Sequence, residues 1–171
     1  MALASGETNY MAPASARQMA SDLALLPMWY ADAGSAVLAP SAYNADFLKT
    51  KSELLSMDVA LLTEPEVADG KDRKFSPWGW DPALRKRLMT LGADQAELPS
   101  ADYMNILREH SHRLQAVKLL PGLRLNEYFC GESFYLNTLA ECSAFVEGRE
   151  VCLLKAPLSG SGKGLNLSLI H

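Results

Sequence analysis

The pattern of apolar positions in the first third of the chain predicts a strand, a helix and a second strand. Two short apolar runs, 36–39 and 58–62, are each closed by polar or turn-forming residues. Short apolar runs of this kind are typical of buried strands. Between them, the apolar residues of 41–55 recur at helical spacing. A strand, a helix and a strand joined by short connections predict a parallel βαβ unit.

Further helices are predicted wherever apolar residues recur every three or four positions. The clearest stripe contains Tyr103, Ile106, Leu107, His110, Leu114 and Val117, and Pro121-Gly122 is expected to close it. Ser15 is the expected N-cap of the first helix, and Gly148 is the expected end of the last. Residues 1–13 are expected to form a loose lead-in and 64–77 an exposed loop. The expected helices span about 15–26, 82–91, 100–120 and 133–146, and a third strand spans 150–155.

These elements predict an α/β fold: three layers, with a small, mostly parallel sheet flanked by helices. The chain of 171 residues is 49% hydrophobic, which is enough to bury one ordinary core. Its net charge of -4 argues against a nucleic-acid binder, which needs excess Lys and Arg to neutralise phosphates.

The chemistry of the termini and cysteines indicates a cytoplasmic protein. The three cysteines lie at long spacings, which suits reduced thiols better than disulfides or a zinc site. The first residues lack a positive region followed by an apolar run, so no signal peptide is expected. No run of about 18 apolar residues occurs, so no membrane span is expected, and a membrane is not among the expected partners.

The segment 151–165 carries the most informative motif, an apolar strand that ends in Lys155 and continues into a Gly/Ser-rich loop. Glycines let backbone N–H groups approach phosphate oxygens, and a lysine adds positive charge. A Walker A loop is excluded, because Gly164 follows Lys163 where Ser or Thr is needed. A dinucleotide fingerprint is excluded because the glycines alternate. A solvated Gly/Ser turn remains an equal alternative on the loop alone.

The string LLKAPLSGSGKGL, residues 153–165, resembles the first nucleotide-binding strand and loop of bacterial ATP-grasp-like proteins. An upstream Pro-Trp-Gly-Trp element before a basic helix, here 77–80 and 81–87, is similar to the same group, as is the stretch 111–113. One departure is Lys163, which stands where the family pattern has Arg and lacks its planar fork.

The resemblance implies a pre-ATP-grasp domain over 15–149, after a flexible lead-in over 1–14. The first strand and loop of an incomplete ATP-grasp domain would then occupy 150–171. The family uses ATP and Mg²⁺ for ligase chemistry, and its magnesium-binding lobe would follow this loop. We therefore expect this chain to be inactive alone, or active only with the missing portion in trans, and the resemblance leaves open whether the chain itself binds ATP or Mg²⁺. The residues implied in nucleotide binding are Lys155, Ser159, Gly160, Ser161, Gly162, Lys163 and Gly164.

Candidates for the acceptor side are Trp78, Trp80, Arg85, His112 and Arg113. For the two tryptophans, covering a hydrophobic core is the favoured alternative, and for Arg85 it is a solvated helix face. His110 and Cys142 lie on apolar stripes and are expected in the core. No metal site and no Ser/His/Asp set can be assembled, so the catalytic residues are unknown.

Two other functions remain open. The chain could be a non-enzymatic interaction module that forms a homodimer through apolar surface that a missing ATP-grasp portion would otherwise cover. It could also be a different phosphate-binding enzyme, although no acid–base group accompanies the loop.

Overall fold

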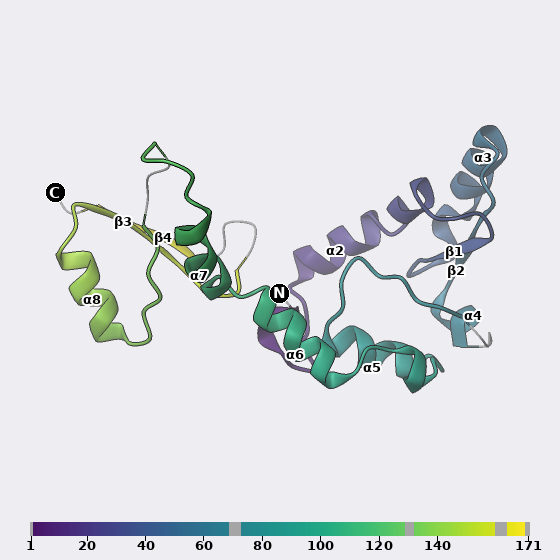
Figure 1. Ribbon diagram of the computed structural model, residues 1–171. Helices are drawn as coiled ribbons and strands as arrows, with labels where there is room; N and C mark the ends of the chain where they lie inside the picture. Colours follow the sequence, from purple (N-terminus) through teal and green to yellow (C-terminus); the bar gives the residue numbers. More distant parts are fainter. Residues whose placement is uncertain (1, 69–72, 129–131, 160–163, 170–171) are drawn as a thin grey trace. The chain divides into compact units, whose positions relative to one another are not determined.

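The structure is a computed structural model that describes residues 2–68, 73–128, 132–159 and 164–169 (Figure 1). It is a mixture of helices and strands, as predicted, and it divides into two compact units. The βαβ unit comprises Glu7–Ser100, and the hairpin unit comprises Leu3–Gly6 and Ala101–His171.

The βαβ unit contains the predicted strand–helix–strand. Strands β1 (Ser35–Leu38) and β2 (Val59–Leu62) are parallel, and α3 (Ala45–Leu55) connects them (Figure 1). The register runs from Ser35 opposite Val59 to Leu38 opposite Leu62. The short helix η2 (Ala42–Asn44) precedes α3, and the Ser41 hydroxyl accepts a hydrogen bond from the Tyr43 N–H. The expected βαβ unit is therefore confirmed.

The core of this unit lies against one face of the parallel pair. Met28 from η1 (Leu26–Trp29) is 1% exposed and packs with Val37, Leu48 and Val59. Each member comes from a different element, so burial of these side chains joins η1, both strands and α3.

The remaining helices of the βαβ unit are α2 (Ala14–Asp22), α4 (Glu64–Ala68), α5 (Pro82–Thr90) and η3 (Gln95–Glu97). Helix α5 begins as expected at Pro82, and the Asp81 carboxylate accepts from the Leu84 N–H at 2.9 Å. The position of the first helix was predicted imperfectly. Pro13, not Ser15, holds the N-cap position of α2, and the helix ends at Asp22. The expectation of an exposed loop over 64–77 misses α4.

The hairpin unit contains α1 (Ala2–Ser5), α6 (Ala101–His110), α7 (Leu114–Leu123) and α8 (Leu139–Glu147). Helix α1 lies where a loose lead-in was expected. The single helix expected over 100–120 is wrong, because it breaks between His110 and Leu114. Pro121, expected to end the helix, lies inside its last turn.

Helix α8 begins at Leu139 rather than at 133. Thr138 and Glu141 form a capping box there, in which each side chain accepts from the backbone N–H of the other residue. Residues 132–137 precede this cap and are not helical. Gly148 ends the helix, as predicted.

Strands β3 (Val151–Lys155) and β4 (Leu165–Leu169) form an antiparallel hairpin (Figure 1). Strand β3 was predicted and β4 was not. One face carries Val151, Leu153, Lys155, Leu165 and Leu167, and the opposite face includes the buried Cys152. Each sheet in the described part of the chain has two strands, so the three-layer arrangement stays a prediction.

Candidate functional site

Lys155 is the last residue of β3, so its predicted position at the end of a strand is confirmed. It pairs with Leu165 across the hairpin, and its side chain is exposed. Its ammonium group makes no hydrogen bond or ion pair with another described residue.

The loop between β3 and β4 is closed at its base by the backbone. The Ala156 N–H donates to the Gly164 carbonyl at 2.7 Å. Gly164 has φ +72°, and a Cβ placed there would lie 2.7 Å from the Ala156 Cβ and 3.3 Å from the Ser159 Cβ. Only glycine fits this position without strain.

Arg113 holds the first half of the loop. Its backbone N–H donates to the Pro157 carbonyl at 2.9 Å, and its Nε donates to the Ala156 carbonyl at 3.1 Å. Its Nη2 donates to the Ser159 carbonyl at 2.7 Å. The residue proposed for the acceptor side thus binds three carbonyl oxygens of the loop, and its guanidinium does not project freely into solvent.

Two backbone donors of the loop remain open. Among the described residues, the N–H groups of Leu158 and Ser159 have no hydrogen-bond partner. Open N–H groups in a Gly/Ser-rich loop suit an anion such as a phosphate oxygen. Ser159 Oγ donates to the Ala156 carbonyl at 3.1 Å, which helps to shape the turn. The remaining loop residues of the predicted site, Gly160, Ser161, Gly162 and Lys163, lie outside the described residues.

His112 lies in the break between α6 and α7. Its Nδ1 accepts from the Leu114 N–H at 3.0 Å, so in the neutral ring the proton is on Nε2. The ring is half-buried and meets Tyr135 edge-on, with the ring centroids 5.5 Å apart. These contacts fix the orientation of the imidazole.

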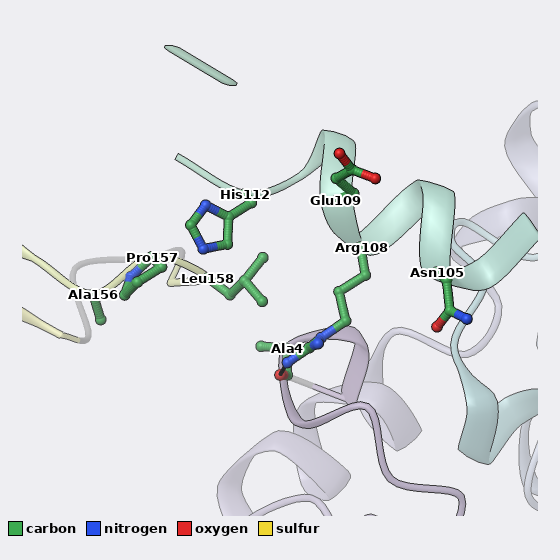
Figure 2. Close-up of a pocket in the computed structure, with 8 residues that line it drawn as sticks. All are labelled: Ala4, Asn105, Arg108, Glu109, His112, Ala156, Pro157 and Leu158. Carbon is green, nitrogen blue, oxygen red and sulfur yellow. Dashed lines mark hydrogen bonds between the residues drawn. The ribbon is translucent and has the colours of Figure 1, made fainter. Parts of the chain in front are cut away.

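His112 also lines an open pocket of about 640 Å³ beside the hairpin loop (Figure 2). Helix α6 contributes three further polar residues, and the wall is completed by Ala4 and residues 156–158. The pocket was not predicted from the sequence, because the prediction for this helix used only its apolar residues. The missed signal is a polar stripe at spacings i, i+3, i+4 and i+7, formed by Asn105, Arg108, Glu109 and His112.

The other acceptor-side candidates belong to the βαβ unit. Trp78 is 74% exposed, so the favoured expectation that it covers a core is wrong. Its indole N–H donates to the Tyr30 hydroxyl, and it lines an apolar pocket of about 480 Å³ with Leu23 and Leu88. Trp80 is half-buried and does not line this pocket.

The guanidinium of Arg85 contacts other parts of the βαβ unit. Its Nε donates to the Pro99 carbonyl at 2.8 Å, and its Nη1 lies 2.9 Å from the Met89 Sδ. Arg85 therefore fastens the segment that follows α5, in contrast to the solvated helix face expected for it.

Two residues assigned to the core lie elsewhere. His110 is exposed, as are Tyr103 and Ile106 of the same stripe, so this face of α6 is not covered as expected, and Cys142 is only half-buried. In the part of the chain that the structure describes, no group of three or more His, Cys, Asp or Glu residues could hold a metal ion. No helix of the described residues is long and apolar enough to span a membrane.

Comparisons with protein-family models, with curated proteins and with solved structures find no match to this chain.

Proposed function

We propose that the β3–β4 hairpin and its loop bind the phosphates of ATP in the manner of an ATP-grasp protein. In this proposal the preceding α/β segment is a pre-ATP-grasp domain with a three-layer fold, in a cytoplasmic protein. The parent activity is the ATP-dependent joining of a carboxylate to an amine or similar nucleophile through an acyl-phosphate.

The observation that carries the proposal is that the Lys155 ammonium and the Leu158 and Ser159 N–H groups, which lie within five positions of sequence, have no partner among the described residues. An ammonium and two N–H donors stabilise a phosphate through charge-assisted hydrogen bonds. Arg113 supports this role indirectly, because it occupies three loop carbonyls and so keeps their negative dipoles away from the anion.

The Mg²⁺ that accompanies ATP in the family would neutralise phosphate charge during transfer. In this chain, Lys155 and the loop N–H groups would bind and orient the phosphates. The proposal includes the expectation that the chain alone does not turn over ATP. Release of inorganic phosphate from ATP by the purified chain, lost in Lys155→Ala, would contradict that part of it.

Amide chemical-shift mapping tests where the nucleotide binds. Addition of Mg-ATP is expected to shift the Leu158 and Ser159 amide signals and to leave those of α3 unchanged. Shifts confined to the βαβ unit, or equal shifts with adenosine, would contradict phosphate binding by the loop.

A homodimerisation module is a second candidate, favoured by the uncovered apolar face of the hairpin. Val151, Leu153, Leu165 and Leu167 share that face and are 61%, 47%, 40% and 63% exposed. Apolar side chains gathered on one face mark a site of association.

Sedimentation equilibrium tests the dimer. Leu167→Glu is expected to dissociate it, and Leu125→Glu is the control, since Leu125 is 84% exposed and lies outside both strands. A chain that stays monomeric at high concentration contradicts this candidate.

A further inference from the structure

We propose that the pocket on the polar stripe of α6 binds a small molecule through a carboxylate or phosphate head group. Lys155 does not line this pocket, although Leu158 of the hairpin loop does, so the two sites share one wall and differ in their charged donors. The inference does not rest on the proposed nucleotide binding.

Three of the polar residues lining the pocket are hydrogen-bond donors. Asn105 and Arg108 lie on α6, and His112 follows one turn after Arg108, so all three side chains line the same pocket (Figure 2). Arg108 uses one Nη2 hydrogen bond, to the Ala4 carbonyl at 3.1 Å, which holds the guanidinium at the pocket wall. Its remaining N–H groups can meet an oxyanion in the forked geometry that arginine favours.

His112 adds a directed donor. Because its Nδ1 is occupied by the Leu114 N–H, the Nε2–H is the group left to donate to a ligand. The edge contact with Tyr135 limits rotation of the ring. A donor that is already oriented loses little entropy when a ligand binds.

The rest of the pocket sets the size and character of the ligand. Its volume, about 640 Å³, lies within the range of small-molecule sites. Leu158, Pro157 and the two alanines Ala4 and Ala156 give it an apolar wall. In Figure 2 the Glu109 carboxylate points away from Arg108, which leaves the guanidinium available to an external anion. The expected ligand is therefore a compact acid with an apolar body.

NMR of the imidazole nitrogens of the full chain tests the site, with inorganic phosphate and acetate as separate probes and potassium chloride holding the ionic strength constant. The His112 signals, assigned with His112→Gln, are expected to shift saturably with one or both probes. The tighter probe identifies the head group. Arg108→Gln is expected to weaken binding by about tenfold, as for the loss of one charge-assisted hydrogen bond.

Glu109→Gln removes a negative charge at the rim and is expected to tighten binding by about twofold. Its carboxylate has no hydrogen-bond partner among the described residues, so this variant should keep the fold. Lys155→Ala and His110→Gln should leave the response unchanged, which separates this site from the nucleotide loop. A response that chloride reproduces, or one insensitive to both Arg108→Gln and Glu109→Gln, overturns the proposal.

Discussion

A guanidinium nitrogen of Arg113 donates a hydrogen bond to the carbonyl oxygen of Ser159 at 2.7 Å, across 46 positions of sequence. The same side chain reaches the Ala156 carbonyl, so one residue at the start of α7 sets the shape of the hairpin loop.

Replacement of Arg113 by alanine is expected to loosen that loop. The loss of charge-assisted bonds to two carbonyls should cost about 1–3 kcal/mol of local stability. Hydrogen exchange of the Ala156 amide, which donates to the Gly164 carbonyl at the base of the loop, would measure this loss as faster exchange. Arg124→Ala is the control, since Arg124 is exposed and follows the end of α7. Equal exchange in Arg113→Ala and the wild type would show that the hydrogen bonds of the Arg113 side chain do not stabilise the loop.

Gly164→Ala should destabilise the hairpin, because φ is +72° and the new Cβ would meet the Ala156 Cβ at 2.7 Å. The expected cost is about 1–3 kcal/mol, measured by urea unfolding followed through hairpin amides. Gly122→Ala is the matched control. It lies in helix α7, where an added Cβ would have nothing within 4 Å, so it should be neutral or stabilising by about 0.5–1 kcal/mol. An unchanged free energy of unfolding in Gly164→Ala would contradict the close approach of Gly164 to Ala156.

Met28→Ala should destabilise the βαβ unit by about 2–5 kcal/mol, since the side chain is 1% exposed among Val37, Leu48 and Val59. Thermal unfolding monitored by circular dichroism would show a lower transition temperature. Met11→Ala, at a site 79% exposed, should change stability by less than about 0.5 kcal/mol. Equal losses of stability in Met28→Ala and Met11→Ala would contradict a core centred on Met28.

The carboxylate of Glu66 is expected to titrate below its usual range. The Thr63 hydroxyl, followed by the Thr63 N–H, donates to it and lowers its pKa. A lowered folded-state pKa means that the stabilisation is present above the unfolded-state pKa and is lost as pH falls through the folded value. Carboxyl NMR titration would measure the pKa of Glu66 directly. In Thr63→Ala the pKa should rise, and an unchanged value would exclude this cause.

The parts of the fold set by local pattern were predictable. Strands β1, β2 and β3 are short apolar runs. Helix α5 begins at Pro82, a residue that favours the first turn of a helix. The break between α6 and α7 was not predictable, because the apolar stripe continues through it. The contact that accompanies the break, from the Arg113 N–H to the Pro157 carbonyl, joins residues far apart in sequence.

Strand β4 was not predicted, although its sequence carries a local signal for a strand. Strand β4 alternates apolar and polar residues, Leu165-Asn166-Leu167-Ser168-Leu169, which is the period of a strand. Of the candidate site, the position of Lys155 at a strand end followed from the sequence. The hydrogen bonds of Arg113 to the loop carbonyls could not be predicted from the sequence, because only the folded chain brings Arg113 to Ser159.

Calorimetric titration of Mg-ATP into the purified chain tests most directly whether Lys155 and its loop bind ATP. The matched variants are Lys155→Ala and Lys118→Ala, the latter removing an exposed lysine of α7 in the same unit. We predict saturable binding that Lys155→Ala weakens by at least about tenfold, equivalent to about 1.4 kcal/mol, and that Lys118→Ala preserves. Absence of binding to the folded chain, or equal losses in both variants, would contradict ATP binding by this loop.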